Sequence, residues 1–300
     1  MQNALILVIT LIWSLISIGQ GPIDGFMKGE GNLDGALGFT VQQSNNYYGA
    51  SNQEFDLNYQ ANLLSFFAQY GITDYLDAVV SLPFIFANAE NKFQDMGLFL
   101  KARPLHYKTE KHFEFSTILS GGYTFPASDY KPDVTGALGQ RAQTIPLRGI
   151  LQAKLPFGLF INGTGTFNFR TDPLSSQISE EALDGLSQEQ LIPSNFTTSM
   201  IRLGFATNKH FIEVFLERQT TFGGVDFVEG EVRPPQLYGV DFTKIGGTYY
   251  YDVDANGIAI NAAYILNGRN IGNIVNVGVS FIIKYRKEND NRKESSLLFD

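Results

Sequence analysis

The chain has 300 residues, no cysteine and a net charge of −8. Charged residues make up 17 % of it, against roughly 25 % in an average soluble chain. The missing cysteine excludes disulfides, thiolate metal sites and a lipidated N-terminal cysteine, and the negative charge argues against nucleic acid as a partner. Aromatic residues are frequent, with 25 Phe and 14 Tyr.

Residues 1–19 have the features of a secretory signal peptide. An apolar run from Ala4 to Ile16 is followed by the small residues Ser17 and Gly19, and the run is too short for a comfortable membrane-spanning helix. No Lys or Arg precedes it, so an N-terminal membrane anchor is the alternative. We expect export, a mature barrel over residues 20–286 and a polar periplasmic tail over residues 287–300.

Twelve segments of the chain alternate apolar and polar residues, which is the pattern of strands with one apolar face. The first and the tenth segment are the least regular. In chain order they cover residues 31–44, 54–70, 75–87, 94–104, 112–125, 143–155, 158–171, 196–207, 210–221, 244–253, 257–266 and 273–286.

The connections between these segments alternate in length. Odd-numbered connections are generally long, as at residues 126–142, 172–195 and 222–243, and even-numbered ones are tight. Long loops at one end and tight turns at the other are typical of an outer-membrane barrel. We therefore predict an all-β fold: an antiparallel up-and-down transmembrane β-barrel of twelve strands, with long extracellular loops and short periplasmic turns. A secreted soluble sandwich or barrel is the alternative.

The last predicted strand also carries a pattern of outer-membrane proteins. The residues Asn276, Gly278, Phe281 and Ile283 resemble the signal that the barrel-assembly machinery reads. The pattern is short and matches many ordinary strands, and here a tail follows the strand. We predict that the assembly machinery is a partner of this chain.

Four stretches resemble one barrel family: residues 69–86, 93–105, 120–130 and 264–281. This family is named for the MetA pathway of phenol degradation, and the resemblance covers residues 55–286. It implies an outer-membrane transporter, distantly similar to the long-chain fatty acid and aromatic-hydrocarbon channels. Few mature residues precede the first strand, so we expect no N-terminal plug of the kind that the fatty-acid channels have.

The predicted inward face of the strands carries charges of both signs. A charged side chain that faces lipid at the bilayer midplane costs roughly 2–4 kcal/mol, so these residues are expected to face the lumen. They either line a water-filled path or pair into a network that fills a narrow barrel. The candidates are Asp56, Asp77, Lys101, Arg103, Glu114, Arg148, Lys154, Arg170, Arg202, Glu213, Glu217 and Lys284.

Three of these candidates are arginines that we expect to form a row of positive charges, here called the basic stripe, along one wall of the lumen. Arg148, Arg170 and Arg202 lie on successive predicted strands, which are spaced about 4.8 Å apart. We expect Arg148 and Arg170 to be close together, with Arg202 deeper. The stripe would attract anions and could pair with Glu213 and Glu217 on the next strand.

The sequence predicts no catalytic or metal site and no cofactor. His106, His112 and His210 map to tight turns, whereas barrel hydrolases place a catalytic His toward the outer rim. Residues 251–257 resemble the start of a calcium loop, but its twelfth position, where Glu is required, is Ala263. A hairpin turn at Asn256 explains the same residues.

Together these features predict a protein of the Gram-negative outer membrane, and not an enzyme. The leading interpretation is a monomeric channel for passive uptake of small hydrophobic or aromatic molecules. The alternative is a closed structural or adhesive barrel that acts through its outer loops, where residues 172–195 predict a short helix beginning at Ser179. The expected partners are outer-membrane lipid, the assembly machinery and a small-molecule solute, with no nucleic acid.

Overall fold

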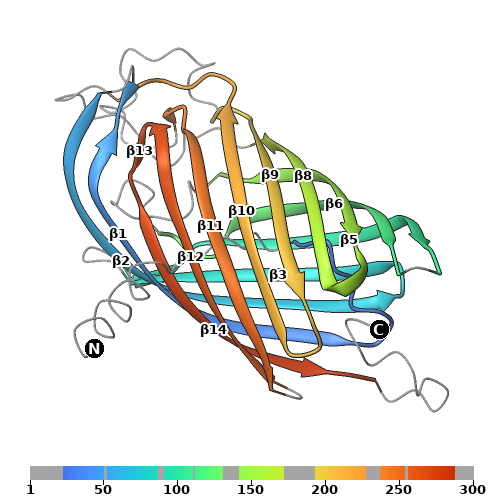
Figure 1. The fold of residues 1–300 in the computed structure, drawn as a ribbon. Helices are drawn as coiled ribbons and strands as arrows, with labels where there is room; N and C mark the ends of the chain where they lie inside the picture. The colour runs from blue at the N-terminus through green and yellow to red at the C-terminus, as the bar shows by residue number, and fades with distance from the viewer. Residues whose placement is uncertain are drawn as a thin grey trace, which may run out of the picture.

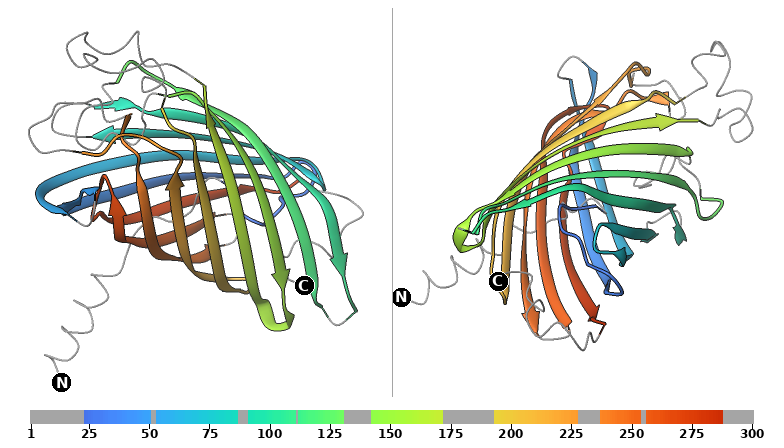
Figure 2. Two further views of the ribbon diagram at one scale, coloured as in Figure 1. Left: turned by 90° about the horizontal axis from the view of Figure 1, so that it is seen from above. Right: turned by 90° about the vertical axis from the view of Figure 1, so that its right-hand side faces the viewer.

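Twelve long strands form one closed antiparallel barrel in a computed structural model, which describes residues 23–50, 53–86, 91–110, 112–130, 142–171, 193–227, 237–253 and 256–287 (Figures 1 and 2). Each long strand pairs with the next, and β14 closes the barrel on β1. The long strands are β1 (Leu33–Tyr48), β2 (Glu54–Thr73), β3 (Leu76–Phe86), β5 (Asp95–Lys108), β6 (Glu114–Pro126), β7 (Thr144–Lys154), β8 (Leu159–Arg170), β9 (Phe196–Ala206), β10 (His210–Thr221), β11 (Asp241–Val253), β12 (Asn256–Arg269) and β14 (Val275–Tyr285).

The prediction of the fold from the sequence is confirmed strand for strand. The first strand ends at Tyr48 rather than residue 44, and the tenth begins at Asp241 rather than residue 244. Two short strands, β4 (Asn91–Phe93) and β13 (Ile271–Gly272), extend the pairing of β3 and β1. Because the barrel is closed, no long strand has an unpaired edge. A bilayer requires this, since unpaired backbone N–H and C=O groups find no water there.

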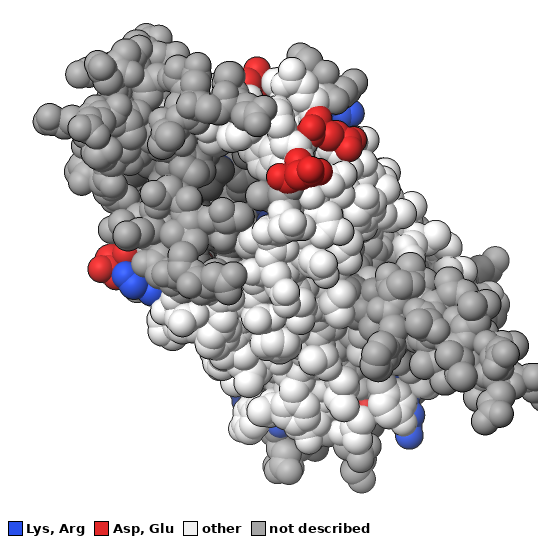
Figure 3. Space-filling view, turned by 90° about the vertical axis from the view of Figure 1, so that its left-hand side faces the viewer, with Lys and Arg blue, Asp and Glu red and all other residues white. Residues whose placement is uncertain are grey.

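The outer surface of the barrel is apolar. On β14, Val275, Val279, Phe281 and Ile283 are all exposed, and Ile283 retains 57 % of its accessible surface. The face shown in Figure 3 has a band without charged residues around its middle, while charged residues gather toward the two ends. Such a band is the surface that lipid covers in a transmembrane barrel.

The outer half of β2 differs from the prediction. Tyr59, Ala61 and Leu63, which an inward Asp56 would place on the outer face, are buried and cluster with Ile85 in the interior. Asp56, predicted to face the lumen, is exposed on the opposite side. At 20 residues, β2 is far longer than the 9–11 that cross a bilayer. Its lower half, with Phe66 and Tyr70 exposed, supplies the lipid-facing residues, so the upper half is free to point polar residues outward.

The two ends of the barrel differ as the sequence predicted. Residues 74–75, 155–158 and 207–209 are tight turns at one end, and the strand ends that residues 127–143, 171–195 and 222–240 connect lie at the other. In the turn before β8, Gly158 has φ +89°, and a Cβ there would lie 2.0 Å from the carbonyl oxygen of Ala206. The predicted helix at residues 179–191 lies outside the described residues.

The described residues include no helix that is long and apolar enough to cross a membrane.

Candidate functional site

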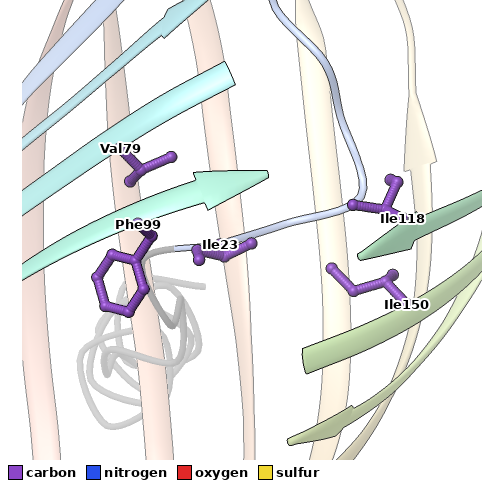
Figure 4. Packing of buried hydrophobic residues seen from close by; sticks show 5 residues of the cluster. All are labelled: Ile23, Val79, Phe99, Ile118 and Ile150. Carbon is purple, nitrogen blue, oxygen red and sulfur yellow. The ribbon is translucent and has the colours of Figure 1, made fainter. Parts of the chain in front are cut away.

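The N-terminal residues 23–32, here called the luminal segment, lie inside the barrel. Ile23 retains 1 % of its surface and packs between Val79 and Phe99 on one side and Ile118 and Ile150 on another (Figure 4). These partners are the inward residues of β3, β5, β6 and β7. The sequence predicted no N-terminal plug of the kind that the fatty-acid channels have, but a short extended segment still reaches the middle of the barrel.

Buried charges anchor the luminal segment to the wall. The Lys101 ammonium, which is fully buried, donates to Asp24 Oδ1 at 3.0 Å and to the carbonyl oxygen of Phe26 at 2.5 Å. The buried Asp77 carboxylate lies 3.8 Å from the same ammonium. Asp77 also accepts from Gln69 Nε2 at 2.6 Å and from the backbone N–H of Lys28 at 3.1 Å. One lysine thus joins a wall carboxylate to a carboxylate of the segment.

Aromatic rings hold the next part of the segment. The ring of Phe26 meets Phe160 edge-on at 5.4 Å and Phe211 at 5.9 Å between centroids. The Lys154 ammonium lies 5.2 Å from the centre of the Phe26 ring. These contacts come from β7, β8 and β10, so the segment is fixed to one side of the lumen.

The base of the segment is hydrogen-bonded to the end of β2. Gly31 N–H donates to the carbonyl oxygen of Gly71 at 2.8 Å, and Gly71 N–H donates to that of Asn32 at 2.9 Å. Gly71 allows this approach because it lacks a side chain: a Cβ there would lie 1.9 Å from the carbonyl oxygen of Gly29.

We expect Gly71→Val to displace the luminal segment without unfolding the barrel. The clash is with the backbone of the segment, and Gly71 lies at the end of β2, where the register already shifts. Amide hydrogen exchange should become fast at residues 23–32 and stay slow in the strands. Gly163→Val is the matched control, because a Cβ there meets nothing within 4 Å.

The charges of the segment should make its docking independent of pH over a wide range. Burial opposes ionisation of Asp24, but Lys101 and Lys28 outweigh it and hold the pKa of Asp24 below its usual range. Burial likewise disfavours the charged form of Lys28, but Asp34 and Asp24 outweigh it and raise the pKa of Lys28.

A carboxyl group with a lowered pKa stabilises the docked segment at every pH above its unfolded-state pKa of about 3.9. This stabilisation is lost only as the pH falls through its lower folded-state pKa. A raised lysine pKa gives stability present below about 10.4 and lost as the pH rises further. We expect a constant exchange protection factor at residues 23–32 between about pH 5 and pH 9. A fall in protection within this window would contradict the ionic anchoring.

A cavity of about 380 Å³ remains beside the luminal segment. Small and polar side chains from the opposite wall line it, among them Ala36, Ser65, Ala259 and Ser280, with Leu63 and Phe67 as apolar patches. Two ion pairs border it: Lys28 with Asp34 at 2.7 Å, and Lys284 with Asp252. The lumen is therefore narrowed on one side and open on the other.

Charged candidates of the lower wall form a second cluster near the tight turns. The Glu114 carboxylate lies 3.2 Å from Lys108 Nζ, 3.5 Å from Lys154 Nζ and 3.7 Å from His106 Nε2. Arg103 donates to the carbonyl oxygen of Asp74 at 3.0 Å. Three basic side chains therefore surround one carboxylate in this cluster.

The three arginines of the predicted stripe are arranged differently than expected. Arg170 stacks on Phe196, 4.7 Å from the ring centre. Arg148 instead donates from Nε to the Thr166 hydroxyl at 2.9 Å. The register explains this: Arg170 pairs with Thr144, which lies four residues from Arg148 along β7, whereas Arg148 pairs with Thr166.

The acids of β10 contact residues of β11, and their pairing with the stripe stays a prediction. Glu217 binds Lys244 at 2.6 Å, and Glu213 Oε1 accepts from the Thr248 hydroxyl at 3.4 Å. Arg202 and Glu213 are both buried, with 3 % and 4 % of their surface exposed.

Part of the long connection after β10 folds over the outer mouth toward β1 and β2 (Figure 1). The ring of Phe227 lies 5.2 Å from Tyr47 and 5.4 Å from Phe55. Asn270 holds this stretch: its Oδ1 accepts from Phe227 N–H at 2.9 Å and its Nδ2 donates to the Gly239 carbonyl oxygen at 2.9 Å. The sequence has no periodic signal for this cover, because side-chain contacts and a few backbone hydrogen bonds hold it rather than a long strand.

The residues of the predicted assembly signal lie on the closing strand. Asn276 is buried in the lumen, opposite Gln42 of β1. Phe281 and Ile283 are exposed on the outer face. Gly278 pairs with Thr40. Recognition by the assembly machinery stays a prediction.

A closed antiparallel barrel with an apolar outside and a charged inside is the architecture of outer-membrane barrel proteins. The COG4313 outer-membrane channel from Pseudomonas putida F1 has a similar structure, with a TM-score of 0.62 and 13 % identity over 89 % of this chain and 100 % of that chain. For the NanC porin the TM-score is 0.50, with 10 % identity over 85 % and 100 %. No family model and no curated relative matches the sequence. These identities show the fold alone, and the resemblance to the MetA-pathway family stays a prediction.

Proposed function

We propose that the protein is an outer-membrane channel for passive uptake of small hydrophobic or aromatic molecules. The observation that carries the proposal is the cavity of about 380 Å³ beside the luminal segment. A barrel filled by its own side chains leaves no such space. The outer-membrane channels with similar folds support a channel role.

The lining of the cavity supports the solute class. Leu63, Phe67 and Phe211 offer apolar contacts, while Lys28 and Lys284 are already paired with carboxylates. A pathway with neutralised charges and apolar patches favours solutes of low charge that are narrower than the remaining opening. It excludes large hydrated polymers by size.

A second candidate function is a closed barrel that acts through its outer loops. The observation in its favour is the firm docking of the luminal segment, in which Lys101 and Asp77 are fully buried. In that case no solute crosses the intact protein.

Planar bilayers and liposomes separate the two functions. We expect the purified protein to form small, ohmic conductance steps and to let benzyl alcohol equilibrate across proteoliposomes faster than across empty ones. A trisaccharide should stay excluded. Folded protein, shown by heat-modifiable migration on gels, that neither conducts nor accelerates equilibration would contradict the channel and favour the structural barrel.

A further inference from the structure

The cavity beside the luminal segment has a wall of small residues at one level of the barrel. Four successive strands contribute them in register: Ser65 of β2 pairs with Gly38 of β1, Gly38 with Ser280 of β14, and Ser280 with Ala259 of β12. All four residues line the cavity. A Cβ at Gly38 would lie 2.6 Å from Ser65 Oγ and 2.8 Å from Ser280 Oγ, so the two hydroxyls flank the same point on the wall.

The side chain of Asn261 borders this row with an unsatisfied amide. Asn261 lines the cavity two residues from Ala259 on β12, and it pairs with Gly278 of β14, two residues from Ser280. Only 7 % of its surface is exposed, and its Oδ1 has no hydrogen-bond partner among the described residues. Diagonal neighbours on adjacent strands lie about 7–8 Å apart, so one small molecule can contact both this amide and the Ser280 hydroxyl.

A buried amide oxygen without a donor is unfavourable, because it has given up water and received no hydrogen bond in exchange. The flanking strands do not supply the donor to Asn261. On β11 its partner Thr248 donates its hydroxyl to Glu213 instead, at 3.4 Å. On β14 its partner Gly278 has no side chain. An O–H or N–H group of a solute in the cavity would satisfy the oxygen.

The charged residues that line the cavity already have partners. These pairs are Asp24 with Lys101, Asp34 with Lys28, Asp252 with Lys284, and Asp95 with the hydroxyl of Tyr130. A second charge brought in by a solute would find no free counter-ion among them, and its desolvation would be costly. The cavity therefore favours a neutral donor group over an ionised one.

We propose that Asn261 and Ser280 form a binding site for the neutral hydroxyl or amide group of a small solute. The apolar part of the solute lies against Leu63 and Phe67, which flank Ser65 on the inner face of β2 and line the same cavity. The proposal rests on the channel function and narrows its solute class. A hydrocarbon of the same shape leaves the amide unpaired, and a site that hydrogen-bonds its ligand discriminates against such an analogue.

Benzyl alcohol and ethylbenzene are matched probes, because they have the same shape and only the alcohol carries a donor. Titrations of the purified protein in detergent, followed by the backbone amide NMR signals of Ala259 and Ser280, give both dissociation constants after correction for partition into empty micelles. A neutral hydrogen bond that satisfies a buried group strengthens binding roughly tenfold. The wild type should therefore bind the alcohol more tightly than the hydrocarbon by about that factor.

Variants of the wall assign this preference to the site. Asn261→Leu replaces the amide by an apolar group of similar volume and should bring the two dissociation constants to the same value. Ser280→Ala should remove part of the preference, and it decides the question if Asn261→Leu does not fold. Ser120→Ala is the matched control and should keep the full preference, since Ser120 is a buried serine with an unpartnered hydroxyl that does not line the cavity.

Equal binding of both probes by the wild type would overturn the site, and so would a preference that persists in both Asn261→Leu and Ser280→Ala. Equilibration of benzyl alcohol across proteoliposomes reports separately on the channel. If the wild type accelerates equilibration but binds both probes equally, the site is refuted and the channel stands. If it prefers the alcohol but does not accelerate equilibration, the channel fails and the hydroxyl site stands as a binding site only.

Discussion

Lys101→Met should release the luminal segment from the wall. The substitution removes the ammonium that Asp24 and the buried Asp77 share, and breaking a buried ion pair costs about 3–5 kcal/mol. The segment should detach while the barrel stays folded, because the backbone pairing of β5 with β3 and β6 does not involve the Lys101 side chain. Trypsin should then cleave after Lys28 in the folded variant, which mass spectrometry detects, while Lys28 stays uncleaved in the wild type.

Two further variants separate this effect from general loss of charge. Lys92→Met removes a lysine from an exposed pair with Asp129 and should leave Lys28 protected, since exposed pairs contribute about 0–1 kcal/mol. Lys101→Met/Asp24→Asn/Asp77→Asn removes all three charges together and should restore much of the protection. Cleavage of this triple variant at the rate of Lys101→Met would show that the ionic contacts do not anchor the segment.

Deleting residues 23–30 should raise the single-channel conductance several-fold. The deletion removes Ile23 and Phe26 from the lumen together with their packing against Phe99 and Phe160, so the ion path widens. Gly31 and Asn32 remain to enter β1. Single-channel recordings measure the effect, and heat-modifiable migration on gels verifies that the barrel has formed. Unchanged conductance from a folded deletion variant would mean that the segment does not narrow the path.

The sequence was sufficient for the strands because lipid imposes a strict alternation on them. On β10, Ile212, Val214 and Leu216 are exposed and alternate with the buried Glu213 and Phe215, as the pattern predicted for this strand. The same rule failed in the outer half of β2, where the strand continues past the bilayer. There Tyr59 and Leu63 face the interior of the barrel, because an apolar side chain outside the bilayer gains nothing from an outward position.

The lumen was less predictable, because its contacts join residues far apart in the chain. The alternation of apolar and polar residues placed Lys101 on the inner face of its strand. Its partner Asp24 lies in a stretch without such a pattern. The alternation along the strands also placed Arg148, Arg170 and Arg202 on the inner face. It does not tell how far along the barrel axis each arginine lies. Depth follows from the register between strands, such as Arg148 with Thr166, and the sequence does not fix that register.

Thiol-specific block at Ser280 tests most directly whether the cavity beside the luminal segment is the solute pathway. Ser280 lines that cavity, Val279 is exposed on the outer face, and the chain has no native cysteine. A charged, water-soluble methanethiosulfonate should abolish the current of Ser280→Cys and leave that of Val279→Cys unchanged. Full labelling of Ser280→Cys, verified by mass spectrometry, with no change in current would contradict the pathway.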